Sequence, residues 1–477
     1  MNSIWNKNIL LFEERFPQLA ELLQAYIALF KKYAGTADEQ NLYSFWKITQ
    51  TRAGVPTAEE SGLRLHSAYN PIKESQTVLA SAEKELSDCE AIIFLGAGLG
   101  YTPVEAAALH PEKTILWIEP DAEHFFAAML ICNLEPLFKS RNPVLAISCT
   151  PEQTSTLINR NSILKSVFFT VKAHTIHNQA YFDTISTLIE RNKNKEKINN
   201  ATLAKFKKLW TSNCQKNSRF IGKLSSIKEY RNKFKGEKFL LLAAGPSLQE
   251  ILPHLKNLKG RIKIVAVDTA LKACLRAGAE PDFIILTDPQ YWAYRHIAGL
   301  KSPSSILITE IAAYPAVFRF ECKKILLCNS QVPMTHEYQK QDLGDLGAGG
   351  SVASSAWNFC AYCGAAEIYV SGLDLSFPNR QTHIKGSTFE ENVHTSSNKI
   401  STSETASLPM LFSGNTCIAE DYNSHSVLTD QRMKMFAWWF ESRLAEIPQI
   451  NTFTLAPQGL AIPGIKPISL QNFLSKF

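Results

Sequence analysis

Residues 238–248 read KFLLLAAGPSL, an apolar run of strand length that ends in a glycine-proline-serine turn. An apolar run bounded by such a turn predicts a buried strand that leads into a helix. Similar runs lie at 262–267, 282–287, 306–309, 324–328 and 367–370. Helical stretches separate several of these runs, and this alternation predicts an α/β fold with a doubly wound, mostly parallel sheet. We place this catalytic unit at residues 238–477.

A shorter pattern of the same kind precedes this unit. Residues 91–95 (AIIFL) lead into Gly96, Gly98 and Gly100, and a second apolar run ends at Glu119. Glycines permit a tight turn, and an acid at the end of the second strand binds ribose hydroxyls in Rossmann units. The pattern predicts a Rossmann-like unit. It either binds a nucleoside cofactor such as S-adenosylmethionine or packs without a ligand.

The positive charge is concentrated between these two units. The whole chain has 50 Lys and Arg against 44 Asp and Glu, but residues 191–238 alone have 15 against 3. We predict a basic helical connector over 191–237, preceded by an N-terminal helical and Rossmann-like domain over 1–190. A solvated helix face, an anionic substrate or an acidic protein partner would account for the charge. The interleaved aromatic residues indicate helix packing rather than a platform for nucleic acid.

Composition and short motifs exclude several classes. The chain is 45% apolar and 20% charged, with neither a run of 18 apolar residues nor a basic and apolar leader, so we expect a cytoplasmic protein without a membrane span. Cys360 and Cys363 lack a second pair, which favours buried free thiols and predicts no metal site. The absence of a G-x-x-x-x-G-K-[ST] motif excludes a P-loop NTPase. The C-terminal unit also lacks the D-x-D motif of metal-dependent sugar transferases.

Polar residues gather at the ends of the predicted strands, where ligands bind in open parallel sheets. Asp268, Asp288 and Asp374 follow strands, and two glycine-serine turns lead into helices, whose N-termini bind phosphate. Together they predict a nucleotide site, although each aspartate alone equally fits a helix cap. The predicted binding residues are Gly245, Pro246, Ser247, Asp268, Thr269, Asp288, Gly349, Gly350, Ser351 and Asp374. The polar residues 376–426 predict a long irregular lid or binding loop.

These stretches, taken in order, resemble the motility-associated factor (Maf) flagellin glycosyltransferases. The similar segments are 242–248, 265–270, 278–282, 287–288, 347–353, 371–375 and 451–465, with His66-Ser67, Tyr69-Asn70-Pro71 and Trp210-x-x-Asn213-x-x-x-Asn217 upstream. The same core resembles the 6-hydroxymethylpterin diphosphokinase MptE-like proteins. Through Gly372-x-Asp374 and residues 425–430 (HSVLTD) it also resembles the sialyltransferases of glycosyltransferase family 42.

The resemblance implies a protein O-glycosyltransferase needed for flagellum assembly and motility. It would move a nonulosonic acid, of the pseudaminic or legionaminic type, from a CMP-sugar to Ser or Thr of flagellin, with no obligatory cofactor. His425 would be the general base, with His383 as the second choice. The tyrosines that follow the Gly-x-Asp motif in the sialyltransferases are replaced by residues 376–377 (SF), so Arg380, His383 or Lys385 would stabilise the leaving phosphate. An ATP-dependent pterin diphosphokinase and a non-catalytic flagellin-binding chaperone remain alternatives.

Overall fold

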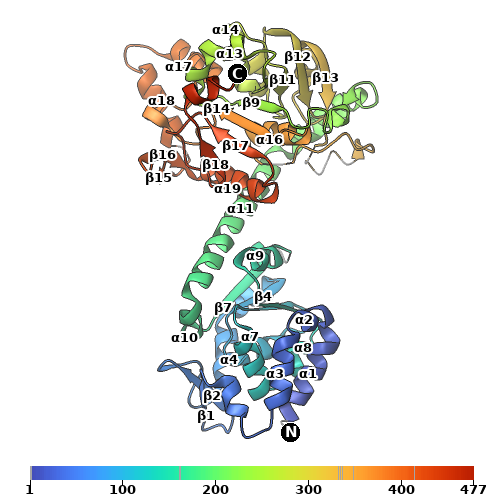
Figure 1. The fold of residues 1–477 in the computed structure, drawn as a ribbon, viewed down its shortest axis with the longest axis vertical. Helices are drawn as coiled ribbons and strands as arrows, with labels where there is room; N and C mark the ends of the chain where they lie inside the picture. The colour runs from blue at the N-terminus through green and yellow to red at the C-terminus, as the bar shows by residue number, and fades with distance from the viewer. Residues whose placement is uncertain are drawn as a thin grey trace. The chain divides into compact units, whose positions relative to one another are not determined.

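The chain forms two compact units, residues 1–201 and 202–477, coloured blue to green and green to red in Figure 1. The computed structural model describes residues 3–160, 163–330, 332, 335, 337–347, 349–412 and 414–477. Within this part of the chain, no helix combines the length and the apolar character that a membrane span requires.

Unit 1 is built on a parallel sheet of four strands in the order β6-β5-β4-β7. The strands are β4 (Ala91–Leu95), β5 (Thr114–Glu119), β6 (Asn142–Ile147) and β7 (Ser166–Thr170). The helices are α1 (Ser3–Arg15), α2 (Pro17–Leu22), α3 (Gln24–Tyr33), α4 (Pro71–Ser81), α5 (Glu83–Asp88), α6 (Tyr101–Leu109), α7 (Ala122–Ile131), α8 (Glu135–Phe138), α9 (Pro151–Asn159) and α10 (Lys172–Thr175). This is the Rossmann-like arrangement that the glycine pattern predicts.

Alternate residues of these strands face opposite sides, as strand geometry requires. Ile92 and Trp117 pack with helices α1, α3 and α7 in one buried cluster. Ile93 and Leu116 pack on the other side with α9 and with Ile185 of helix α11 (Gln179–Asn217). Both faces of the sheet are therefore covered, which explains why the strands read as continuous apolar runs.

The N-terminal part of unit 1, which we expected to be helical up to the Rossmann-like strands, also contains a small sheet. After α3, residues 47–64 form a small antiparallel sheet of β1 (Lys47–Gln50), β2 (Pro56–Glu60) and β3 (Leu63–Arg64). Gly54 and Gly62 lie between its strands with φ values of 75° and 82°, a conformation that glycine adopts without steric cost.

Unit 2 contains a nine-stranded sheet in the order β18-β17-β14-β9-β10-β11-β12-β13-β8, with every neighbouring pair parallel. Its strands are β8 (Ser225–Ser226), β9 (Lys238–Leu242), β10 (Lys263–Val267), β11 (Phe283–Ile285), β12 (Lys301–Thr309), β13 (Glu321–Leu327), β14 (Glu367–Ser371), β17 (Asn451–Thr454) and β18 (Ile465–Pro467). The predicted α/β class and parallel sheet are confirmed. The chain order reverses between β9 and β14, which is where open α/β sheets bind ligands.

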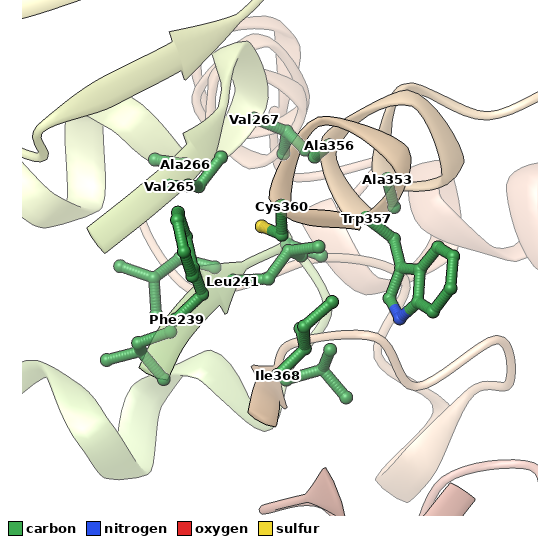
Figure 2. Packing of buried hydrophobic residues seen from close by; sticks show 14 of the residues in the cluster. Phe239, Leu241, Val265, Ala266, Val267, Ala353, Ala356, Trp357, Cys360 and Ile368 are labelled. Carbon is green, nitrogen blue, oxygen red and sulfur yellow. The ribbon is translucent and has the colours of Figure 1, made fainter. Parts of the chain in front are cut away.

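Helices cover both faces of this sheet. On one face α16 (Val352–Tyr362) lies over the central strands, and its Trp357 and Cys360 pack with Leu241 and Val265 (Figure 2). On the other face α14 (Asp268–Arg276) and α15 (Tyr291–Ile297) pack with β11 and β12. Cys360 and Cys363 are fully buried free thiols, as predicted. The remaining short helices are α12 (Leu248–Ile251), α13 (Leu255–Leu258) and α20 (Leu470–Leu474).

The segment 376–426 is not an irregular loop, contrary to the expectation from its polar composition. It contains α17 (Thr388–Ser396), α18 (Ser403–Phe412) and β15 (Thr416–Glu420), which pairs with β16 (Ser426–Asp430) in a hairpin. Side chains at the element ends explain the difference. Ser387 accepts a hydrogen bond from the Glu390 N–H and caps α17, and Asp430 caps α19 (Gln431–Glu446) through the Met433 N–H.

Candidate functional site

The turn after β9 and the turn after β14 are joined where the chain order reverses. Asp374 Oδ2 accepts the Ser247 N–H at 3.0 Å, and Ser247 Oγ accepts the Gly372 N–H at 3.0 Å. A Cβ atom on Gly245 would lie 2.2 Å from Asp374 Oδ2, so only glycine fits there. We call this arrangement the 247–374 lock. It brings Gly245, Pro246, Ser247 and Asp374 together, with the Ser247 N–H and Oγ both bonded within the protein.

Asp374 is buried in the lock. Burial raises the pKa of its carboxyl, although the hydrogen bonds from Ser247 act in the opposite direction. Its Oδ1 atom has no hydrogen-bond partner among the described residues. The carboxyl therefore keeps one acceptor atom that the protein does not use.

Three acids follow consecutive strands of the sheet: Asp268 after β10, Asp288 after β11 and Glu310 after β12. Burial, and then the nearby Asp288, raise the pKa of Asp268 to about 8. Burial raises the pKa of Glu310 to about 8 as well, with Asp288 adding to the effect against a hydrogen bond with Ser330. Asp288 is half-buried. We call these three residues the acid row. Together with Thr269 at the start of α14, their carboxyl groups can form hydrogen bonds with hydroxyl or amino groups of a ligand.

The binding residues predicted from the sequence do not include Glu310, although it follows an apolar strand as Asp268 and Asp288 do. The rule that ligand-binding residues follow strand ends would have found it.

Two buried amides of α11 hold the loops that carry the acid row. Asn213 Nδ2 donates to the carbonyl oxygens of Pro289 and Ala312 at 2.9 and 3.0 Å. Asn217 Nδ2 donates to those of Ile311 and Ala313 at 2.9 and 2.8 Å. Each side-chain amide therefore donates both of its hydrogens to backbone carbonyl oxygens close to Asp288 or Glu310 in sequence. The C-terminal end of the basic helix α11 therefore has a structural role, independent of any ligand that its positive charge binds.

His383 is partly buried, beside the turn after β9. The next residue, Ile384, donates its N–H to the Ala244 carbonyl at 2.9 Å. The His383 ring stacks on Phe389 with centroids 4.1 Å apart, and His296 contacts the same phenyl ring. Burial, and then the neighbouring His296, lower the pKa of His383 to about 4, so its imidazole is neutral at physiological pH and a weak base.

His425 is more exposed than His383 and lies at the turn of the β15–β16 hairpin. Its side chain is 78% exposed, and its Nδ1 atom lies 3.5 Å from Asp421 Oδ2. Asp421 is buried and accepts the N–H groups of Asn423 and His425 at 2.8 and 2.9 Å. Burial opposes its charge, but these N–H groups outweigh burial and lower its pKa. Because Asp421 lies beside Nδ1, the second ring nitrogen of His425, Nε2, is the one that can interact with a substrate.

The second predicted turn, residues 349–351, is closely packed. A Cβ atom on Gly349 would lie 2.1 Å from Ser354 Oγ, and one on Gly350 would lie 2.9 Å from Phe436 of α19. Ser351 Oγ accepts the Ala353 N–H at 3.3 Å and caps α16. These glycines make room for α19 and for the helix start. Ala348, within the similar segment 347–353, lies outside the described residues.

Side chains closely approach the glycine turn of unit 1, and a cavity of about 260 Å³ beside it is lined by Gly96, Ala97 and His66 among others. A Cβ atom on Gly96 would lie 2.9 Å from the His174 ring, and one on Gly98 would lie 2.7 Å from His66 Nε2. Glu119 accepts a hydrogen bond from His174 at 2.8 Å, so the predicted ribose-binding acid is engaged within the protein. Burial opposes a charge on His174, but Glu119 and Glu60 outweigh it and raise its pKa to about 10. Both alternatives for this turn, a bound nucleoside and packing without a ligand, stay predictions.

The chain is similar to known proteins both in sequence and in fold. Residues 212–380 match the family model of the 6-hydroxymethylpterin diphosphokinase MptE-like proteins. The solved structure of the MAf glycosyltransferase from Magnetospirillum magneticum AMB-1 matches 99% of this chain and 75% of that chain, with a TM-score of 0.60 and 14% identity. The chain has the fold of that glycosyltransferase. The MptE-like segment includes Asp268, Asp288 and Glu310, and the shared fold extends beyond it into unit 1.

Uncharacterized proteins of Treponema pallidum (strain Nichols) are also similar. One is 34% identical over 231 residues, which are 42% of this chain and 59% of that protein. Another is 26% identical over 259 residues, 53% of this chain and 85% of that protein. The chain thus spans about three fifths of the length of the first relative.

Proposed function

We propose that the chain is a glycosyltransferase that moves a nonulosonic acid of the pseudaminic or legionaminic type from CMP to Ser or Thr of flagellin in the cytoplasm. The observation that carries the proposal is the fold, which is that of a Maf glycosyltransferase over 99% of the chain. The ordered motifs between residues 242 and 465 support the donor and acceptor classes, because the glycosyltransferases they resemble use them. Flagellin would be the protein partner, and flagellum assembly would depend on the transfer.

The residues of unit 2 suit such a transfer. Asp288, the most exposed member of the acid row, and Thr269 would bind ribose hydroxyls of the nucleotide. In the reaction the bond from the anomeric carbon to the phosphate oxygen breaks, and CMP leaves with the bonding electrons. The acceptor hydroxyl oxygen bonds to that carbon and passes its proton to His425 Nε2. No metal is required by this scheme.

The structure gives a reason to prefer His425 over His383 as the base. A protein acceptor needs a base that it can reach, and His425 is exposed with its ring positioned by Asp421. His383 is enclosed by Phe389 and the turn after β9, and its pKa of about 4 makes it a poor proton acceptor. We assign His383, with Arg380 and Lys385 nearby in sequence, to the wall on the leaving-group side.

Incubation of the chain with flagellin and CMP-pseudaminic or CMP-legionaminic acid, followed by intact-mass measurement, tests the proposal. We expect one or more sugar-mass additions. His425→Ala should retain nucleotide binding and lose at least about 100-fold in transfer rate, as loss of a general base does. His394→Ala is the matched control, since His394 is an exposed histidine on α17. Full transfer by His425→Ala would remove His425 as the base.

A second candidate is supported by the family match of residues 212–380. An ATP-dependent 6-hydroxymethylpterin diphosphokinase would use the acid row to hold Mg²⁺ and would release AMP. The same protein preparation should therefore be incubated with ATP and the pterin. AMP release, with no mass gain on flagellin from either donor, would replace the glycosyltransferase by the kinase. Flagellin binding with neither product would favour the chaperone.

A further inference from the structure

A buried group of histidines and carboxylates lies in unit 1, apart from the unit 2 residues of the proposed transfer. Glu60 ends β2, His124 lies on α7 and His174 lies on α10. These three residues are 4%, 9% and 2% exposed. His124 Nε2 lies 2.9 Å from Glu60 Oε1, and His174 Nδ1 lies 3.4 Å from Glu60 Oε2. Three segments that are distant in sequence thus direct one nitrogen or oxygen each toward a common point.

The spacing of these atoms suits a metal ion. One ligand atom from each residue can be chosen so that all lie within 4.8 Å of one another. Ligands about 2.0–2.1 Å from a tetrahedral zinc ion are about 3.4 Å apart. The 3.4 Å separation of His174 Nδ1 and Glu60 Oε2 is long for a hydrogen bond and equals that edge. Small side-chain shifts would bring the set to ligand distances.

One of the other ring nitrogens has the partner that metal-bound histidines usually have. His174 Nε2 lies 2.8 Å from Glu119 Oε2, and this carboxylate fixes the orientation of the imidazole and raises its basicity toward a metal. His124 Nδ1 is buried without a hydrogen-bond partner among the described residues, and Asp121 Oδ2 lies 3.5 Å from it. Glu60 is further held by the Trp46 indole N–H at 3.0 Å. This second layer is what distinguishes the group from a chance ion pair.

The charges favour a divalent cation. Glu60 and Glu119 are both buried, at 4% and 1% exposure, and Glu119 Oε1 has no hydrogen-bond partner among the described residues. Burial of carboxylates is costly unless a cation balances them. Without a metal, a protonated His174 offsets part of this negative charge. A divalent ion would balance both carboxylates and displace that proton, because neutral imidazole is the form that binds metals.

We propose that Glu60, His124 and His174 bind a divalent transition-metal ion of the zinc type. Imidazole and carboxylate ligands favour zinc and its neighbours over magnesium and calcium. Two histidines and one glutamate leave a fourth position open. His177, whose Nε2 atom lies 3.7 Å from Glu60 Oε1 and whose side chain is 29% exposed, stands on the accessible side as a candidate fourth ligand. The site departs from the sequence expectation of no metal, and it does not depend on the proposed glycosyl transfer.

The test measures metal binding by the full-length chain after chelator treatment and dialysis. We expect one equivalent of zinc by elemental analysis, and ligand-field absorption from cobalt at the same stoichiometry. Glu60→Gln and His124→Gln should each weaken zinc binding by at least about 100-fold, and Glu119→Gln by about 10-fold to 100-fold through the second layer. His110→Gln, a histidine of the same unit outside the group, is the matched control and should bind as the unchanged chain does.

Thermal unfolding of each variant without metal identifies those that fold. Because a ligand of the native state raises stability, zinc should raise the Tm of the unchanged chain and of His110→Gln but not that of Glu60→Gln. The proposal is overturned if the unchanged chain binds no zinc. It is equally overturned if folded Glu60→Gln and His124→Gln bind zinc as tightly as His110→Gln does, since the metal would then lie elsewhere.

Discussion

Replacement of Asn217 by alanine tests whether α11 positions the acid row. The change removes two hydrogen bonds and leaves the buried carbonyl oxygens of Ile311 and Ala313 without these donors. Each bond contributes about 1 kcal/mol, and an unsatisfied buried group costs about 1–3 kcal/mol. Partial hydration reduces the sum, so we expect a loss of about 3 kcal/mol in the local stability of residues 310–313. Asn217→Asp should be at least as harmful, because its carboxylate would face two carbonyl oxygens.

Hydrogen-exchange mass spectrometry is the suitable assay, because a chain of two units need not unfold in one step. A loss of about 3 kcal/mol corresponds to exchange more than about 100-fold faster in peptides covering residues 310–313. Peptides from unit 1 should be unchanged. Gln215→Ala is the control, since Gln215 is exposed on the same helix. Exchange in Asn217→Ala within about threefold of this control would refute the positioning role.

Three further predictions concern the same unit. Gly245→Ala should destabilise it by about 3 kcal/mol in urea unfolding, because the new Cβ would lie 2.2 Å from Asp374 Oδ2. Asp268 and Glu310 bind protons more tightly in the folded state, with pKa values of about 8. Their contribution to stability is therefore complete below about pH 4 and is lost as the pH rises toward 8, and Asp268→Asn should flatten this slope in unfolding measured from about pH 5 to 8. Asp288→Ala should raise the Kd for CMP at least about tenfold by calorimetry, whereas an unchanged Kd would place Asp288 outside the site.

The central strands of both sheets could be predicted from the sequence because burial on two faces leaves a continuous apolar run. Residues 91–95 and 367–370 fall within β4 and β14, and the acids after such runs fall at one edge. The 247–374 lock could not be predicted. Its two turns are about 125 residues apart, and their contact exists only because β9 and β14 are neighbours.

The polar segments were harder to interpret for a physical reason. Residues 376–426 lack a strong apolar period, and their helices and hairpin depend on caps such as Ser387 and on contacts with the sheet. The Glu60, His124 and His174 group likewise leaves no local signal. Its members are 64 and 50 residues apart, so no ligand spacing is visible before the strands are assembled.

The 247–374 lock has a consequence for how related chains can vary. A Cβ at position 245 would collide with the Asp374 carboxyl and with the Gly372 carbonyl oxygen, 2.6 Å away, and a shorter residue at 374 would remove the first of these two clashes. Substitutions at the two positions should therefore be non-additive, with a double variant such as Gly245→Ala with Asp374→Ser less harmful than the sum of the single changes. Among homologous sequences, positions 245 and 374 should therefore covary. This covariation would identify the junction of β9 and β14 even in homologues that are too divergent to align elsewhere.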